Sequence, residues 1–285
     1  MQRSEFRFFD RLRVRWAEID AQKIVFNGHY LMYFDTAIAG YWRALGMPYA
    51  ETMASFDGDL FVRKAEIEYM DSARYDDVLD IGMRCARVGT SSAVFVGGAF
   101  RGQSLLVSCS LTYVFADPHG TASRPVPREL RELFDRFERG ESMVDVRVGS
   151  WAELGADARP IRTQVFIAEQ KIPAEMEWDD ADESAVHAVA YNRLGQALAT
   201  GRMLEHVPGV AKIGRMAVAA SSRHGGVGRA VLEALLDAAR SRGEREAVLH
   251  AQLSAAPFYE RAGFVRRGPE FDETGIAHVE MLRGL

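Results

Sequence analysis

A glycine-rich segment, Arg223 to Arg229, separates two stretches of different periodicity. The stretch before it, Lys212 to Val218, is strand-like. The stretch after it places apolar residues at helical spacing: Val227, Ala230, Val231, Ala234, Leu235 and Ala238. Glycine lets a backbone approach a ligand closely, and the free N–H groups at a helix start attract an anion. The sequence therefore predicts a strand, a turn and a helix start that together bind a phosphate or pyrophosphate.

The turn reads R-x-x-G-x-G, which separates it from two better-known phosphate-binding loops. It lacks the Lys-Ser/Thr pair of a P-loop, so we expect no hydrolysis of nucleoside triphosphates. It also differs from the G-x-G-x-x-G of dinucleotide-binding folds. An ordinary glycine-rich connection between a strand and a helix is the alternative interpretation.

Composition narrows the class of protein. With 285 residues, 48% hydrophobic and 26% charged, the chain is expected to form two globular domains. A net charge of −5 argues against a nucleic-acid partner. The amino-terminal residues lack an apolar signal region, and no apolar run is long enough to span a membrane. Cys85 and Cys109 are expected in the core of a cytoplasmic protein, with a disulfide between them as the alternative.

A change of pattern near residue 140 predicts the domain boundary. Residues 128–138 form a charged helix pattern with one apolar face, and Gly140 ends it. Residues 143–148 then alternate between apolar and polar side chains, as a new strand would. We therefore predict domains over residues 1–141 and 142–285.

The first domain is predicted to be α+β. Residues 12–16 alternate as a strand, and residues 30–45 form a helix that is apolar around most of its circumference. Such a helix is expected to be wrapped by a sheet. Four further strand patterns follow, with Gly89 and Gly102 between them at plausible hairpins; they cover residues 60–69, 78–88, 93–100 and 105–115.

The second domain resembles the GNAT acetyltransferases. Four ordered segments carry the resemblance: Gln164 to Gln170 (V-F-x-x-E-Q), the R-x-x-G-x-G turn, Ala256 to Phe264 (A-x-x-F-Y-x-x-x-G-F) and Gly275 to Met281 (G-I-A-H-V-E-M). The resemblance implies a mixed α/β fold that transfers an acetyl group from acetyl-CoA to an amine.

The resemblance also assigns roles to residues. The expected pyrophosphate cradle consists of Arg223, His224, Gly225, Gly226, Val227, Gly228 and Arg229, with Arg223 and Arg229 adding positive charge. Met216 and Val218 lie on the strand expected to pair with the pantetheine arm. Tyr259 is expected to protonate the CoA thiolate, which a phenol with a pKa of about 10 can do; a core tyrosine is the alternative.

The general base is left open by the sequence. The candidates are Glu169, His187, His250 and His278. The acidic run at residues 175–183 is interpreted as a solvated loop, with attraction of a cationic amine or of a binding partner as the alternatives. No His/Cys cluster has metal-ligand spacing, so no metal is expected.

The first domain resembles the hotdog-fold acyl-CoA thioesterases, most nearly the 4-hydroxybenzoyl-CoA and Tol-Pal-associated (YbgC-type) enzymes. The resemblance rests on residues 14–31, on Glu66 to Tyr69 and on Ala73 to Asp77. It implies an antiparallel sheet wrapped around a long helix. It also implies a homodimer or tetramer that binds acyl-CoA across the subunit interface.

Asp20 matches the catalytic aspartate of those thioesterases, which attacks the thioester or activates water. A backbone N–H near Asn27 is expected to polarise the thioester carbonyl. A turn-capping role for Asp20 is the alternative, and Glu18 is the second candidate carboxylate, or a solvated one. Lys23 replaces a usual glycine, so a differently built turn is expected. His29 lies two residues after the position, Asn27, where the family has a histidine.

The sequence thus predicts a bifunctional enzyme with acyl-CoA and amine substrates and no metal cofactor. Two alternatives remain: a single catalytic domain joined to a CoA-binding regulatory module, and a scaffold in which neither domain is active.

Overall fold

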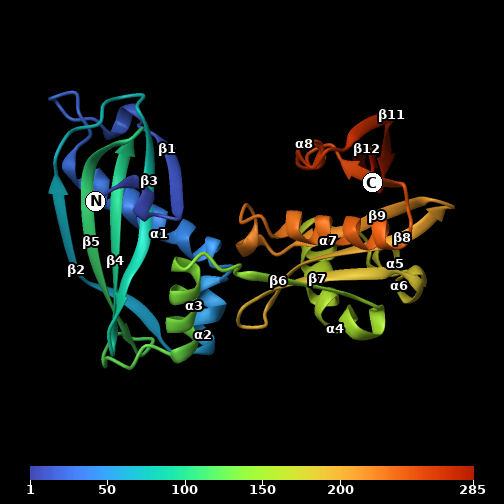
Figure 1. The fold of residues 1–285 in the computed structure, drawn as a ribbon, viewed down its shortest axis with the longest axis horizontal. Helices are drawn as coiled ribbons and strands as arrows, with labels where there is room; N and C mark the ends of the chain where they lie inside the picture. The colour runs from blue at the N-terminus through green and yellow to red at the C-terminus, as the bar shows by residue number, and fades with distance from the viewer. The chain divides into compact units, whose positions relative to one another are not determined.

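The computed structural model describes residues 1–285 and divides into two compact units, Met1–Met143 and Val144–Leu285. Figure 1 shows the elements of both. The strands and helices of the first unit are β1 (Phe8–Arg13), α1 (Asn27–Ala44), α2 (Tyr49–Ser55), β2 (Asp59–Tyr69), β3 (Val78–Val88), β4 (Ser92–Arg101), β5 (Ser104–Ala116) and α3 (Arg128–Glu138), with 3-10 turns η1 (Arg3–Glu5) and η2 (Trp16–Glu18).

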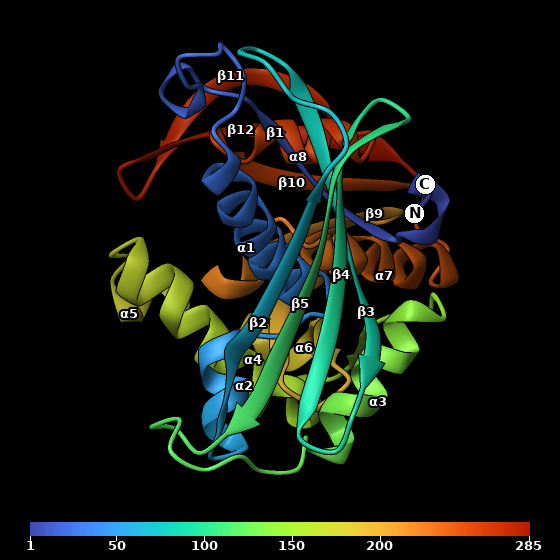
Figure 2. The same cartoon turned by 90° about the vertical axis from the view of Figure 1, so that its left-hand side faces the viewer.

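The first unit is a five-stranded antiparallel sheet in the order β1-β3-β4-β5-β2. Figure 2 shows β2, β5, β4 and β3 side by side, with α1 crossing one face. α1 turns Tyr33, Phe34, Ala37 and Tyr41 onto the sheet, and all are buried. The antiparallel sheet with its long helix confirms the predicted hotdog architecture.

Two details of the first unit differ from the sequence prediction. The first strand runs from Phe8 to Arg13, and the alternating segment at 12–16 continues into a 3-10 turn rather than a strand. The central helix is buried on one face only, since the apolar side chains of Leu31 and Met32 on its other face are exposed. Cys85 and Cys109 are both buried and unpaired.

The second unit is a seven-stranded mixed sheet in the order β11-β12-β10-β9-β8-β7-β6. Its elements are β6 (Val144–Gly149), α4 (Trp151–Arg162), the π-helix η3 (Thr163–Glu169), α5 (Ala174–Glu177), α6 (Ala181–Ser184), β7 (Val186–Asn192), β8 (Ala197–Val207), β9 (Val210–Val218), η4 (Ala220–Ser222), α7 (Val227–Ser241), β10 (Glu246–Gln252), α8 (Ala256–Arg261), β11 (Val265–Glu273) and β12 (Ile276–Gly284).

The core of the second unit lies between this sheet and α7. Val231, Leu232, Leu235 and Leu236 of α7 are fully buried. Val231 and Leu235 belong to the predicted stripe, whereas Leu232 and Leu236 lie beside it and extend the buried face. α4 covers the opposite face of the sheet (Figure 1). This mixed sheet with helices on both faces confirms the predicted GNAT-like fold.

Candidate functional site

The candidate site of the second unit is a cleft that opens where two strands separate. β9 and β10 run parallel, but they pair only from Val210 to Lys212 on β9 and from Glu246 to Val248 on β10. From Ile213 to Val218, this edge of β9 therefore has no partner strand. An unpaired edge presents a row of backbone N–H and C=O groups, so β9 offers hydrogen bonds to any extended group lying in the cleft.

A β-bulge lies in the same stretch of β9. Arg202 of β8 pairs with Gly214, whereas Thr200 pairs with Ala217, so Arg215 and Met216 together face one residue of β8. Arg215 has a φ of 52°, which is uncommon for a non-glycine residue. The bulge locally turns the backbone and re-aims its side chains.

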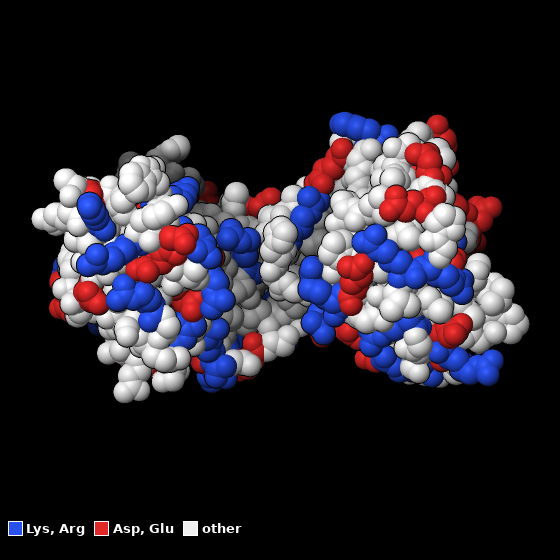
Figure 3. All heavy atoms as spheres, turned by 90° about the horizontal axis from the view of Figure 1, so that it is seen from above, with Lys and Arg blue, Asp and Glu red and all other residues white.

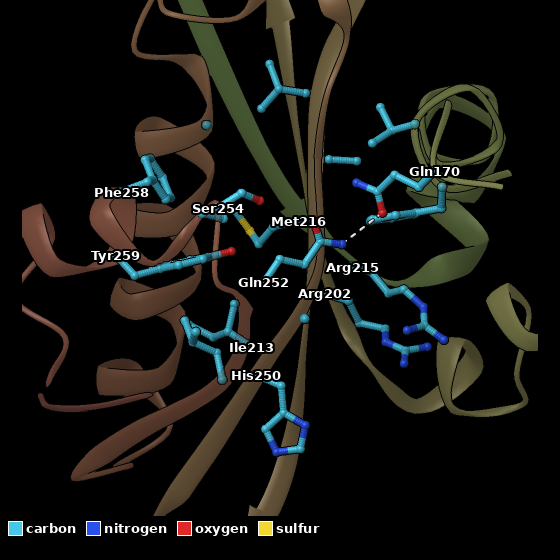
Figure 4. Close-up of a pocket in the computed structure, with 18 of the residues that line it drawn as sticks. Gln170, Arg202, Ile213, Arg215, Met216, His250, Gln252, Ser254, Phe258 and Tyr259 are labelled. Atoms are coloured by element: carbon cyan, nitrogen blue, oxygen red, sulfur yellow. Dashed lines mark hydrogen bonds between the residues drawn. The ribbon is translucent and has the colours of Figure 1, made fainter. Parts of the chain in front are cut away.

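The cleft has a volume of about 1150 Å³, which is large enough for a substrate-sized ligand. Figure 4 shows Tyr259 and Phe258 on one side, and Gln170, Arg202 and Arg215 on the other. The Nε2 of Gln252 donates to the Oε1 of Gln170 at 2.9 Å, linking β10 to the end of η3. Met216 and Val218, predicted from the sequence, both line the cleft.

The glycine-rich turn forms one end of this cleft. No backbone N–H group from His224 to Arg229 donates to a protein acceptor. Gly226 precedes the first residue of α7 with a φ of 81°, a conformation that glycine adopts without strain. A Cβ built on Gly226 would meet no atom within 4 Å, so the space in front of the turn is open. Consecutive free N–H groups at the start of this 15-residue helix have the geometry that favours an anion.

The two arginines of the turn differ in their surroundings. Arg223 donates from Nε to the carbonyl oxygen of Val218 at 3.1 Å, and its Nη2 lies 2.5 Å from the carboxylate of Glu169. Its charge is thus already paired within the protein. Arg229 has no ion-pair partner, and neither has Arg261 on α8, although both line the cleft.

Tyr259 extends its hydroxyl from α8 toward the centre of the cleft (Figure 4). Its ring packs against Phe258 and Phe264, so it is a core residue as well as a cleft residue. Burial raises the pKa of Tyr259 to about 12. The phenol therefore stays protonated at neutral pH and retains a proton to donate.

The four candidates for a general base lie in different environments. Glu169 is paired with Arg223. His187 does not line the cleft; burial lowers its pKa, and its Nε2 bonds to the carbonyl oxygen of Asp182. His278 lines the cleft, but its Nδ1 bonds to the carbonyl oxygen of Ile276. His250 also lines the cleft, and neither of its ring nitrogens makes a protein hydrogen bond.

The acidic run at 175–183 is only in part the solvated loop expected from the sequence, since Glu175, Asp180 and Glu183 are exposed but Glu177 and Asp182 are buried. Glu177 and Asp182 are buried against Arg162, with the Glu177 carboxylate 2.5 Å from Nε and that of Asp182 2.8 Å from Nη1. Arg202 contacts both Asp179 and Asp182.

Burial and the neighbouring arginines shift the pKa values of these three carboxylates in opposite directions. Burial raises the pKa of Glu177. A hydrogen bond from Arg202 lowers the pKa of Asp179. Burial favours the neutral form of Asp182, but hydrogen bonds from Arg162 and Arg202 lower its pKa nonetheless. The carboxylates of Glu177, Asp179 and Asp182 are therefore paired with arginines and are not free to attract a cationic amine. Those of Glu175, Asp180 and Glu183 are exposed and form no ion pair.

The sequence analysis missed Arg162, Arg202 and Arg215. Arg215 joins the cluster by contacting Asp179 and Glu177, which ties the bulge of β9 to α5. Their partners lie 15 to 39 residues away in sequence, so no local spacing could have found them. An arginine inside an otherwise apolar strand, such as Arg202 in β8, is the one signal the sequence offered.

In the first unit, Asp20 lies at the tip of a short hairpin. Ile19 pairs with Val25, and the Oδ1 of Asp20 accepts a hydrogen bond from the N–H of Gln22 at 2.8 Å. The carboxylate thus caps its own turn through one oxygen. Lys23 takes a φ of 63°, the left-handed conformation that costs a non-glycine residue about 1–2 kcal/mol.

Asn27 begins α1 at the base of this hairpin. Its N–H and that of Gly28 donate to no protein acceptor, as is usual in a first helical turn. No hydrogen bond joins Asn27 to Asp20 within one copy of the chain. His29 packs its ring edge against Phe26.

Glu18 has a structural role rather than an exposed one. It is buried and accepts hydrogen bonds from the backbone N–H and the Nε of Arg15 and from the hydroxyl of Tyr33. Burial opposes ionisation, yet these hydrogen bonds lower its pKa. The expectation that Glu18 is either solvated or catalytic therefore has no support in its contacts.

Two properties of the whole chain complete the description. No helix is both long and apolar enough to cross a membrane, and no group of three or more His, Cys, Asp or Glu side chains is arranged to hold a metal ion. On the face seen in Figure 3, basic and acidic side chains are interspersed over each unit.

Comparison with known proteins yields two family matches. The model described as "Acetyltransferase (GNAT) domain" matches residues 155–284, and the model described as "Thioesterase superfamily" matches residues 22–108. Each match lies within one of the two compact units.

Curated relatives match the second unit. The uncharacterized N-acetyltransferase YjcF of Bacillus subtilis is 35% identical over 128 residues, which cover 45% of this chain and 90% of that protein. The uncharacterized protein YyaT of the same organism is 33% identical over 130 residues, covering 45% and 86%.

Solved structures resemble each unit in turn. An acyl-CoA N-acyltransferase from Pseudomonas aeruginosa is 32% identical with a TM-score of 0.45, covering 49% of this chain and 99% of that one. A thioesterase-superfamily protein from Jannaschia sp. CCS1 is 21% identical with a TM-score of 0.44, covering 47% and 94%. The chain therefore belongs to the GNAT acetyltransferases through its C-terminal unit and to the thioesterase superfamily, with a hotdog fold, through its N-terminal unit.

Proposed function

We propose that the second unit transfers an acetyl group from acetyl-CoA to an amine. The observation that carries the proposal is the row of free N–H groups from His224 to Arg229 at one end of a cleft bordered by the unpaired edge of β9. A pyrophosphate suits such N–H groups. A pantetheine arm carries amide groups that suit an unpaired strand edge.

Different residues of the cleft would carry out different parts of the proposed reaction. The turn and Arg229 would hold the pyrophosphate, while Arg223, whose charge is paired with Glu169, would fix the turn through the carbonyl oxygen of Val218. Met216 and Val218 would line the pantetheine channel. Tyr259 would give its proton to the departing CoA thiolate. Holding both reactants in one cleft also lowers the entropic barrier to attack.

For the first unit we propose hydrolysis of acyl-CoA thioesters. The free oxygen of the Asp20 carboxylate would attack the thioester or activate water. The free N–H groups of Asn27 and Gly28, at the positive end of the α1 dipole, would stabilise the oxyanion. Since no hydrogen bond joins Asp20 to Asn27 within one copy, this proposal fits a site completed by a second copy.

The surface of the first unit supports such an assembly. β2 is an edge strand of 11 residues, and most of its residues are exposed. Phe61, Val62 and Tyr69 on β2 are exposed, as are Leu31 and Met32 on α1. An exposed edge strand that carries apolar side chains offers a surface for pairing with another chain, although Lys64, Glu66 and Glu68 make this edge only partly apolar. We propose a homodimer, or a tetramer built from dimers, formed through this edge.

A single catalytic domain is the second candidate function. The paired charge of Arg223 and the hydrogen bond that ties the Asp20 carboxylate to its own turn are the observations that favour it. In that case, one unit would bind CoA without turnover and regulate the other.

Thiol release from short-chain, long-chain and aromatic acyl-CoAs, measured with and without an amine, tests both activities. Release without an amine that Asp20→Asn abolishes would support hydrolysis by the first unit. Release that needs an amine and survives Asp20→Asn would support acetyl transfer. No release in either assay would contradict both proposals.

A further inference from the structure

Proton removal from the amine is the one step of acetyl transfer for which the proposed function names no residue. Most of the carboxylates at the cleft are already paired, Glu169 with Arg223, Glu177 with Arg162 and Asp179 with Arg202. His278 is anchored through Nδ1 and stacks on Phe271. His224 belongs to the turn at the anion-binding end.

His250 occupies a different position. Val248 is the last residue of β10 that pairs with β9, and its partner there is Lys212. His250 lies two residues beyond Val248, and Gly214 lies two residues beyond Lys212. Gly214 immediately precedes the bulge residue Arg215. His250 therefore lies near the point where the strands separate and the β9 backbone is re-aimed (Figure 4).

Charged groups from two other strands surround its ring. The Nδ1 of His250 lies 3.4 Å from a carboxylate oxygen of Glu273 on β11, and its Nε2 lies 3.9 Å from one of Glu280 on β12. Glu280 is also bonded to Arg267 and lies in the field of His206. Lys212 and His278 line the same cleft.

Resting on the proposed acetyl transfer, we propose that His250 is the general base that deprotonates the amine. The amine arrives as an ammonium ion and must lose two protons in becoming an amide. His250 accepts one before attack and passes it to water, which its 30% exposed side chain permits. The C–N bond then forms and the C–S bond breaks. The thiolate takes a proton from Tyr259, and the second amine proton restores the phenol, so one proton is released per turnover.

Steady-state kinetics of the full-length protein test this role. The assay uses acetyl-CoA and whichever of three probe amines (spermidine, Nα-acetyl-lysine or a short peptide with a free amino terminus) the wild type acetylates fastest. His250→Gln should lower kcat by about 100- to 10,000-fold, while calorimetry shows acetyl-CoA binding unchanged within about twofold. Wild-type kcat should rise from pH 5 to 8, where imidazole loses its proton, and this rise should vanish in the variant.

Two further variants complete the test. His250→Ala should be partly rescued by added imidazole, which a purely structural histidine would not allow. The exposed His206→Gln is the matched control and should keep the wild-type kcat. If His250→Gln retains kcat within about threefold, or loses acetyl-CoA binding and turnover together without rescue, the role is overturned. Absence of transfer by the wild type would instead overturn the proposed function, and this role with it.

Discussion

The carboxylate of Glu169 lies 2.5 Å from the guanidinium of Arg223, and this contact joins the π-helix η3 to the glycine-rich turn. Two sequence motifs that stand 54 residues apart therefore meet beside the cleft. Their charges cancel where an anionic pyrophosphate is proposed to bind. A π-helix is rare and often marks a functional site, which agrees with its position here.

Removing the Glu169 charge should strengthen acetyl-CoA binding. Glu169→Gln leaves Arg223 free to contact an anion and removes a negative charge from the site. Because both side chains are partly exposed, the gain should be modest, about two- to fivefold in Kd, as for other exposed pairs. Calorimetry measures it. Weaker binding would show that the ion pair is needed to position the turn.

A side chain at Gly226 should obstruct the anion site. Gly226→Glu places a carboxylate in the open space before the turn and should weaken acetyl-CoA binding more than about tenfold, since juxtaposed like charges cost several kcal/mol. Gly226→Ala is the control, because it carries the same strain at a φ of 81° without the charge. Equal affinities of the two variants would argue against a pyrophosphate at this turn.

Tyr259→Phe should reduce acetyl transfer and leave the fold intact. The variant keeps the ring that packs on Phe258 and Phe264 and removes only the hydroxyl. We expect kcat to fall about 100- to 10,000-fold with little change in acetyl-CoA affinity. Since burial raises the pKa of Tyr259 to about 12, the wild-type phenol should stay protonated, and kcat should not decline between pH 8 and 10. An unaffected kcat in the variant would leave Tyr259 a core residue only.

Arg162→Met should destabilise the second unit strongly. Arg162 is 1% exposed and Glu177 2%, and removing one partner of such a buried pair typically costs about 3–5 kcal/mol. Arg159→Met is the matched control, because Arg159 stacks on the same Trp178 ring as Arg162 without contacting a carboxylate. Urea unfolding of both variants should separate them clearly. Similar stabilities would mean that the charge cluster contributes little.

Asp20→Asn should abolish thiol release from acyl-CoA in the absence of an amine. The amide oxygen of asparagine can still accept the hydrogen bond from Gln22, so the turn should persist. Circular dichroism and acetyl-CoA binding should therefore match the wild type. Full thioesterase turnover in this variant would leave Asp20 with the turn-capping role alone.

Much of the fold followed from local patterns. The periodicity at 128–138 predicted α3, and the alternating strand patterns at 60–69, 78–88, 93–100 and 105–115 predicted β2 to β5 to within a residue or two of their ends. The prediction of a strand at 12–16 was wrong because alternation alone does not determine where a strand pairs. Leu12 and Arg13 end β1, and Trp16 begins a 3-10 turn.

The sequence by itself determined the two family resemblances, both fold classes and the glycine-rich turn, since helical spacing, strand alternation and left-handed glycines are properties of neighbouring residues. Only the tertiary structure decided which charges are free. Three carboxylates of the acidic run, those of Glu177, Asp179 and Asp182, are paired with Arg162, Arg202 and Arg215. Arg223 is paired with Glu169. These partners meet only when distant elements pack. The cleft likewise exists because β9 and β10 pair for three residues and then separate, a consequence of how the sheet twists and packs.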